Sequence, residues 1–298
     1  MKSTYSHIAA LVLLACLSAC TERIFLANEG MPPKLVITGI ISNMPASHEF
    51  YLQNSSGSYF APAEESMSNP FLGPAEVWLD EEKLTSTGGG HYRTRKDFST
   101  RPGQKYTLTV RCDYDQDGRI EEYKASTTAP RAYTLDSISI NSLVSGQNLP
   151  GIMMLHYQDS IGKDYIAAYM TINNELYSNR LLRFGFVSNN LFGQDGSYCH
   201  VPISNWLINK DLPHDNDTKK PLYRYDELFV EMVMLSAEVY AFYDAARTQL
   251  GQSNPLFGAR GNLPTNFSGG ALGVFGALFQ SNAASVILDY PELPEREK

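Results

Sequence analysis

The stretch QKYTLTVRC, residues 104–112, carries the alternation that decides the fold class of this chain. Apolar side chains occupy every second position of it: Tyr106, Leu108, Val110 and Cys112. Polar residues stand between them. A period of two sends neighbouring side chains to opposite faces of a β-strand, one buried and one in solvent. The stretch therefore predicts a half-buried strand.

Similar short segments precede it, at residues 34–42, 48–53, 75–80 and 91–95. Clusters of turn residues separate them, for example SSGS, TSTGGG and RPGQ. Short strands at this spacing, with no helical pattern between them, are typical of antiparallel two-sheet folds. We expect a mainly β protein with an immunoglobulin-like antiparallel sandwich over residues 34–130.

Residues 131–298 predict a second, β-rich domain. Two paired strands are expected around the turn SIGK, at residues 152–159 and 164–173. Further strands are expected at residues 180–188 and 227–235. One helix is expected near residues 236–250. Ser236 can cap it, Gly251 can end it, and five apolar residues share one face: Val239, Phe242, Tyr243, Ala246 and Leu250.

The segment GGALGVFGALF, residues 269–279, is followed by the strand-like SVIL. Its glycines resemble a membrane-helix packing motif only superficially, because the apolar run is short. In a strand, glycines allow a close approach of two backbones or a bulge.

The N-terminus predicts export and lipid attachment. Lys2 precedes an apolar run that ends in Leu17-Ser18-Ala19-Cys20, the pattern of a lipoprotein signal peptide. Cleavage after residue 19 would leave Cys20 for acylation, followed by a tether over residues 20–33. The alternatives are attachment at Cys16 or an ordinary secretory signal. No other window holds 18 consecutive apolar residues, so the remainder is expected to be tethered at the membrane, not to span it.

The composition excludes a strongly basic nucleic-acid-binding surface, because the chain has 32 acidic and 24 basic residues and a net charge of −8 at pH 7. Beyond the signal peptide and Cys20, only Cys112 and Cys199 are cysteines. In an oxidising envelope they could form one disulfide or remain two separate buried thiols, and the sequence leaves both open.

The acidic stretch DYDQDGRIEE, residues 113–122, directly follows the opening strand. Asp113, Asp115, Asp117 and Gly118 fit positions 1, 3, 5 and 6 of a calcium loop, and Glu121 could serve at position 9. Lys124 stands where an EF-hand has its bidentate Glu, and the preceding segment is a strand, so a true EF-hand is not expected.

The competing interpretation is a hairpin with Asp117-Gly118 as a two-residue turn. That register places Asp113 opposite Glu122, and two like charges directly opposite are destabilising. A hard cation would remove the repulsion. The candidate Ca²⁺ ligands are Asp113, Asp115, Asp117, Glu121 and Glu122, and the alternative is a solvated acidic turn.

Several segments together resemble a family of Bacteroidetes lipoproteins known as domain-of-unknown-function family 4249. They are the lipid-attachment pattern, LVITGIISN (35–43), GPAEVWLDEE (73–82), RPGQKYTLTV (101–110), LDSISI (135–140) and, most specifically, the segment from EVYAFYDAARTQLGQ to GGALGVFGALF (238–279). The resemblance implies an immunoglobulin-like N-terminal half, a β-rich C-terminal half and pairing with an outer-membrane TonB-dependent receptor. It implies no catalytic residues.

The sequence also lacks the G-x-S-x-G, H-E-x-x-H and C-x-x-C motifs. The family resemblance implies an accessory or ligand-capturing partner of a TonB-dependent receptor, and we expect a non-catalytic outer-membrane lipoprotein. The alternative is a freestanding glycan- or peptide-binding surface module, which could depend on calcium. Residues Thr21-Glu22-Arg23 leave open whether it faces the cell surface or the periplasm. Asn254–Phe279 is the expected partner interface, unless its glycines and aromatics close a core.

Overall fold

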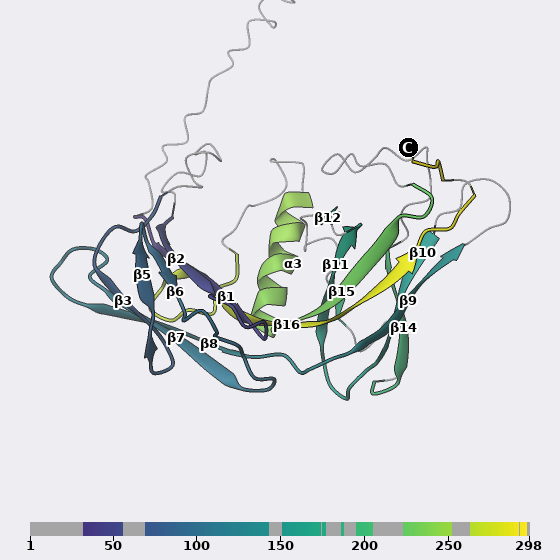
Figure 1. The fold of residues 1–298 in the computed structure, drawn as a ribbon. Helices are drawn as coiled ribbons and strands as arrows, with labels where there is room; N and C mark the ends of the chain where they lie inside the picture. The colour runs from purple at the N-terminus through teal and green to yellow at the C-terminus, as the bar shows by residue number, and fades with distance from the viewer. Residues whose placement is uncertain are drawn as a thin grey trace, which may run out of the picture.

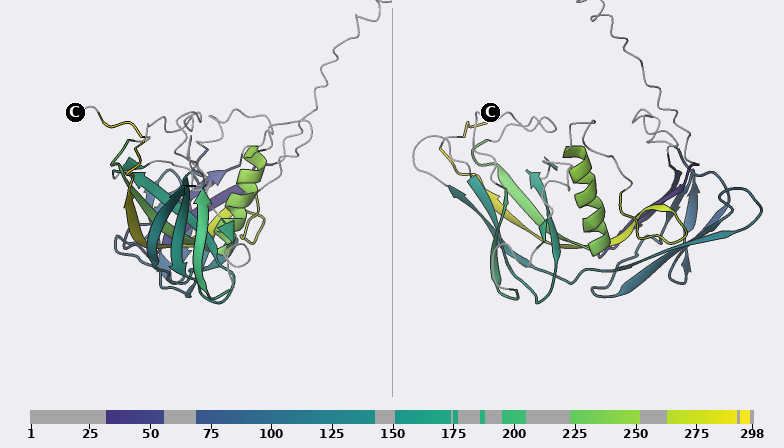
Figure 2. Two further views of the ribbon diagram at one scale, coloured as in Figure 1. Left: turned by 90° about the vertical axis from the view of Figure 1, so that its right-hand side faces the viewer. Right: turned by 180° about the vertical axis from the view of Figure 1, so that it is seen from behind.

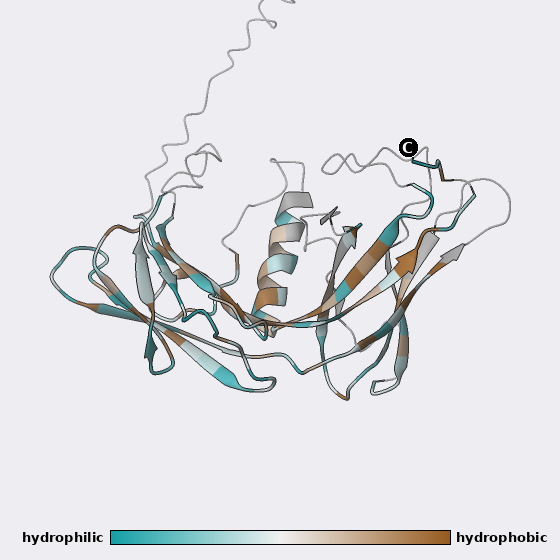
Figure 3. Cartoon of the chain, viewed as in Figure 1, coloured by the Kyte–Doolittle hydropathy of each residue, from teal (hydrophilic) through white to brown (hydrophobic). Residues whose placement is uncertain are grey.

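A computed structural model describes residues 32–55, 69–142, 151–173, 175–176, 186–187, 195–204, 223–251, 263–291 and 293–296. Within these ranges the protein is mainly β, with three sheets and a single helix, which confirms the predicted mainly β class (Figure 1). Hydrophobic (brown) and hydrophilic (teal) stretches follow one another along strands such as β15 (Figure 3). No helix in the described ranges is long and apolar enough to cross a membrane.

Five strands of the first half lie close to the predicted segments: β1 (Leu35–Ser42), β2 (Glu49–Asn54), β3 (Ala75–Leu79), β6 (His91–Arg93) and β7 (Lys105–Cys112). The structure adds β4 (Glu82–Lys83), β5 (Thr85–Gly88) and β8 (Glu121–Thr128), and β5 falls on TSTGGG, which was predicted to be a turn. In β7, Tyr106, Leu108, Val110 and Cys112 are all buried, as the alternation predicts.

The second half adds β9 (Leu135–Ser142), β10 (Gly151–Gln158), β11 (Tyr165–Ile172), β12 (Glu175–Leu176), β13 (Phe186–Val187), β14 (Tyr198–Ser204), β15 (Glu227–Leu235), α3 (Ala237–Gly251) and β16 (Leu272–Ile287). One sheet has the order β12-β11-β15-β16-β1-β2-β6-β5, with β13 also paired to β11. The other two are β14-β10-β9 and β4-β3-β7-β8.

β16 joins the two halves of the chain. Its first part runs parallel to β1, with Val36 paired to Leu272, and its second part runs antiparallel to β15, with Glu227 paired to Ile287. The long sheet therefore runs through both groups of strands, and β16 crosses between them at the base of α3 (Figures 1 and 2). A strand from the C-terminal segment thus completes the sheet built by residues 34–130.

Two main cores lie between sheets. The first packs the four-stranded sheet against β1, β2, β6 and the start of β16, and it includes Phe50, Leu108 and Phe275. The second packs the three-stranded sheet against β11 and β15, and it includes Tyr157 and Ile166. The predicted boundary at residue 130 falls between the two groups of strands, yet Phe267, Ala271, Phe275 and Ala277 belong to the first core.

The predicted helix is confirmed as α3. Ser236 immediately precedes it, and its main-chain carbonyl accepts the N–H of Tyr240 at 3.0 Å. The Ser236 hydroxyl accepts the N–H of Ala277 in β16 at 3.2 Å, so this side chain anchors the helix to the long strand. Val239, on the face of the helix that meets β16, is fully buried.

Glycines in β16 permit these contacts, as the sequence predicts for a strand. A Cβ on Gly273 would lie 2.0 Å from the carbonyl oxygen of Ile37, where β1 and β16 pair. A Cβ on Gly276 would lie 2.1 Å from Cγ2 of Val239, so a side chain here would push the helix away from the sheet. Both glycines therefore reflect close approach, which their lack of a side chain makes possible.

One pairing prediction is wrong. β10 and β11 do not form a hairpin, because β10 pairs with β9 and β14 while β11 pairs with β12, β13 and β15. The intervening turn carries the chain from one sheet to the other. Two buried aspartates at its ends, Asp159 and Asp164, hold the crossing in place.

Candidate functional site

The acidic stretch lies in the loop between β7 and β8, and the register of these strands differs from the predicted one. Cys112 pairs with Glu121, and Arg111 pairs with Glu122. The predicted pairing of Asp113 with Glu122 is thus wrong by two residues. Gln116 and Gly118 take the left-handed backbone conformation, whereas a two-residue turn would need it at Asp117 and Gly118.

The shift removes the like-charge pair that the predicted register would create. Arg111 Nε donates to Glu122 Oε2 at 2.7 Å, and Lys124 Nζ lies 2.5 Å from Glu122 Oε1. Hydrogen bonds from Lys124 and Arg111 lower the pKa of Glu122. Glu122 is therefore neutralised by two cations and is not part of the carboxylate cluster.

The other four predicted ligands are brought together. Carboxylate oxygens of Asp113, Asp115, Asp117 and Glu121 all lie within 4.8 Å of one another. Main-chain N–H groups hold the carboxylates inward: Gly118 donates to Asp113 Oδ2 at 3.0 Å, and Tyr114 donates to Glu121 Oε2 at 2.7 Å. Flanking strands replace the helices of an EF-hand, as the sequence predicts.

Asp113 provides the observation that bears on a cation. Its Oδ1 is buried and has no hydrogen-bond partner in the described part of the chain. A buried carboxylate oxygen without a partner is costly, and a hard cation satisfies it through direct coordination. The oxygen-only donor set, spaced as positions 1, 3, 5 and 9, suits Ca²⁺ better than a softer transition metal.

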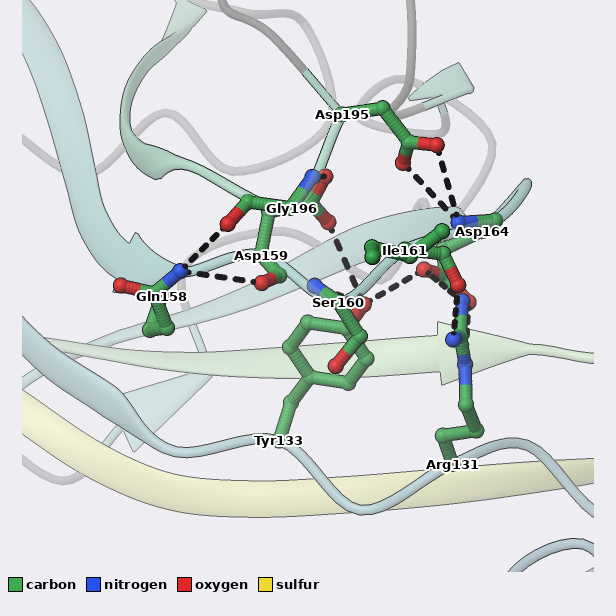
Figure 4. Close-up of polar contacts among 10 residues, drawn as sticks. Arg131, Tyr133, Gln158, Asp159, Ser160, Ile161, Asp164, Asp195 and Gly196 are labelled. Carbon is green, nitrogen blue, oxygen red and sulfur yellow. Dashed lines mark hydrogen bonds and ion pairs between the residues drawn. The ribbon is translucent and has the colours of Figure 1, made fainter.

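A second polar cluster surrounds the turn between β10 and β11, and the sequence analysis missed it (Figure 4). Tyr133, in the segment between β8 and β9, donates its hydroxyl to Asp164 Oδ2 at 2.5 Å and also contacts Asp159 Oδ1 at 3.2 Å. Arg131 Nη2 donates to the same Asp164 oxygen at 2.6 Å. Gly196, just before β14, donates its N–H to Asp159 Oδ2 at 3.3 Å.

This cluster connects three segments and leaves no free acid or base at its centre. Burial and the bond to Asp164 raise the pKa of Tyr133, so its hydroxyl stays protonated and acts as a donor. Asp195 accepts the N–H of Gly162 at 2.9 Å, which closes the outer side of the turn. The sequence signal for this cluster was an aspartate at each end of the predicted turn. The partners of these aspartates are far away in the sequence and could not be predicted from it.

The two cysteines are separate buried thiols, which decides between the alternatives that the sequence leaves open. Cys112 lies in the first core and Cys199 in the second. Burial, with smaller effects from Glu121 and Asp113, raises the pKa of Cys112 to about 12. Burial also raises the pKa of Cys199. Neither thiol has the low pKa of a nucleophile.

A model of the family described as domain of unknown function (DUF4249) matches residues 24–283. The chain belongs to the DUF4249 family. The predicted family resemblance is thereby confirmed. No similar protein is found among those with curated descriptions. The DUF4249 match includes the acidic loop, the Tyr133 cluster and most of β16, and the family description gives no activity.

Several predictions on this DUF4249 protein fall outside the described residues, wholly or in part. Cys20, the signal peptide and most of the tether lie outside them, as do residues 180–185 and 188 of a predicted strand and residues 254–262 of the expected interface. In the described remainder of that segment, Phe267, Val274 and Phe275 are buried. This favours the interpretation that the segment closes a core, which is the one shared with the N-terminal strands.

Proposed function

We propose that this DUF4249 protein is a non-catalytic outer-membrane lipoprotein that captures a ligand or assists transport as the partner of a TonB-dependent receptor. The lipid-attachment pattern at Cys20 supports the location, and family membership supports the comparison with lipoproteins of this type. A short tether would confine the folded part near the membrane, so even a modest interface gains from a high effective concentration.

The proposal that the protein is non-catalytic rests on the contacts of its buried carboxylates. Asp159, Asp164 and Asp226 are the buried carboxylates of the described ranges, and each is engaged in structural contacts. Asp226, for example, accepts from Asn173 at 2.9 Å and from the N–H of Tyr223 at 3.0 Å. A general acid or base needs a carboxylate open to a substrate, so these groups favour a scaffold for binding.

An immunoglobulin-like architecture for residues 34–130 belongs to this proposal. The sheet orders β1-β2-β6-β5 and β4-β3-β7-β8 correspond to the ABED and C′CFG sheets of that fold. Tyr106, near the start of β7, accepts the main-chain N–H of Arg101 at 2.8 Å. This contact has the form of the tyrosine corner that many such domains carry before strand F.

A calcium-dependent binding module is the second candidate. The convergence of four carboxylates around the partnerless Oδ1 of Asp113 favours it specifically. Under this proposal, Ca²⁺ would hold the β7–β8 loop in one conformation and so prepare an adjacent surface for a glycan or peptide. Extracellular calcium at millimolar concentration suffices to fill even a weak site.

Co-purification from detergent-solubilised outer membranes distinguishes the two. The accessory-subunit proposal predicts that the full chain brings along a TonB-dependent receptor in a fixed ratio, with or without EDTA. A Cys20→Ala variant, lacking the anchor, should recover much less. If no receptor co-purifies but glycan or peptide arrays are bound only with calcium, the freestanding module is the better description.

The interface itself can be probed on the surface of the family-specific segment. Pro264, Thr265 and Ser268 are exposed in the described part of it. Substituting Pro264 by Glu should reduce receptor recovery at an unchanged melting temperature if this surface contacts the receptor. If the substitution instead lowers the melting temperature and leaves receptor recovery unchanged, the segment serves only to close the core.

A further inference from the structure

Two histidines far apart in the sequence meet on the outer face of the three-stranded sheet. His156 in β10 pairs directly with His200 in β14, and their Nδ1 atoms lie 2.6 Å apart. His200 is exposed and His156 is half-buried, so the rings face solvent and not the second core. The ring centroids are 4.8 Å apart.

A third side chain orients the pair from the other neighbouring strand. Ser139 Oγ in β9 lies 2.7 Å from His156 Nε2. When a histidine binds a metal through one nitrogen, the other commonly donates its N–H to an oxygen that fixes the ring. Ser139 is placed to accept that N–H, which would leave Nδ1 of His156 with its lone pair toward His200.

We propose that His156 and His200 form a bidentate site for a late first-row divalent metal ion such as Zn²⁺ or Cu²⁺, with Ser139 as a positioning residue. Neutral imidazole nitrogens are the donors these ions prefer, whereas Ca²⁺ prefers oxygen.

The geometry requires only a small adjustment. Bonds of about 2.0–2.1 Å at a tetrahedral ion separate two ligand nitrogens by about 3.3 Å. The rings would move apart by less than an ångström, which side-chain rotation on an exposed face permits. The remaining coordination positions face solvent and are available to water or to donor groups of a partner.

The site is distinct from the acidic loop in both place and chemistry. It lies on the sheet β14-β10-β9, whereas the acidic loop connects β7 and β8 of another sheet. The proposal does not rest on the proposed function, because the metal is bound by this chain alone. Filling the acidic loop with calcium beforehand therefore separates the two sites in one sample.

The test uses the full chain without a polyhistidine tag, after EDTA has removed bound metal. The protein is then kept at twice the concentration of Cu²⁺, with about 1 mM Ca²⁺ present. Electron paramagnetic resonance should show two equivalent imidazole nitrogens on Cu²⁺. His156→Asn and His200→Asn should each reduce the signal to one nitrogen and lower Zn²⁺ affinity in calorimetry by at least about 10-fold.

Two further variants keep the result interpretable. His91→Asn removes an exposed histidine on β6 and should change neither measurement. Ser139→Ala should weaken Zn²⁺ binding by about 10–100-fold while two nitrogens remain on Cu²⁺. Melting temperatures without metal confirm that each variant folds. Binding that survives both histidine substitutions, or an unmutated chain with a single coordinating nitrogen, would overturn the proposal.

Discussion

Glu122 stands directly opposite Arg111 across the β7–β8 pair, with Arg111 Nη2 2.6 Å from Glu122 Oε2. The acidic loop lies just beyond this pair. With Glu122 bound to Arg111, the eight residues 113–120 lie outside the strands, and Asp113, Asp115 and Asp117 turn toward Glu121. The register predicted from the Asp117-Gly118 turn would have placed Asp113 opposite Glu122.

The first prediction concerns calcium. Adding Ca²⁺ at millimolar concentration should raise the melting temperature by about 2–5 °C, because a ligand that binds only the folded state stabilises it by mass action. Asp115→Asn combined with Asp117→Asn should remove the shift in differential scanning fluorimetry. Glu122→Gln is the matched control, because Glu122 lies outside the cluster, and should keep the shift. If calcium does not change the melting temperature of the unmutated chain, the loop is a solvated acidic turn without a calcium site.

The second prediction concerns the crossing between β10 and β11. Tyr133→Phe removes the hydroxyl shared by the buried carboxylates of Asp159 and Asp164, and we expect a loss of about 2–4 kcal/mol in the free energy of unfolding. Urea denaturation measures it. Tyr51→Phe, which removes a hydroxyl from an exposed contact with Glu49, should cost less than about 1 kcal/mol. Equal costs for the two variants would contradict a special role for the Tyr133 cluster.

The third prediction concerns the contact between α3 and β16. Gly276→Ala should destabilise the fold by about 1–3 kcal/mol, because its Cβ would overlap Cγ2 of Val239. Val239→Ala makes room for that methyl group. The double variant should therefore lose less stability than the two single losses added together, and thermal unfolding of all four proteins gives the coupling. Strict additivity would mean that the helix does not press on β16 at this point.

The fourth prediction concerns alkaline pH. The pKa of Cys112 is raised from 9.0 to about 12 and that of Tyr123 from 10.0 to about 12, both mainly by burial. A raised pKa in the folded state means that the folded protein holds protons which the unfolded chain has released. Stability should thus be unaffected by these groups below about pH 9 and fall as the pH rises from about 9 to 12. Urea midpoints at pH 7, 9 and 11 measure the decline.

Thiol labelling gives an independent check on the same cysteine. At pH 8, iodoacetamide should not modify Cys112 or Cys199 in the folded protein, and both should react in urea. Mass spectrometry of peptides identifies the modified residue. Rapid labelling of Cys112 without urea would contradict its burial in the first core.

The fifth prediction concerns the anchor. Cys20→Ala should abolish incorporation of a fatty-acid analogue during growth, because the acylated thiol is gone. Cys16→Ala should retain the label. The reverse outcome would place the lipid on Cys16.

The local elements follow from patterns within short stretches of sequence. A period of two in residues 104–112 predicts a strand, the apolar run 227–235 predicts another, and a period near 3.6 after Ser236 predicts the helix, because such patterns are properties of a few neighbouring residues. The signal-peptide pattern is likewise local. The family resemblance needed only several such segments in order.

Tertiary structure alone decided the pairings, because contacts between distant residues depend on which strands become neighbours. The Asp117-Gly118 turn signal favoured one hairpin register, yet the ion pair of Glu122 with Arg111 and Lys124 accompanies another. The turn SIGK favoured a hairpin, yet the bonds from Tyr133 to Asp159 and Asp164 hold a crossing between sheets. His156 and His200 are 44 residues apart, and only the antiparallel pairing of β10 with β14 makes them one site.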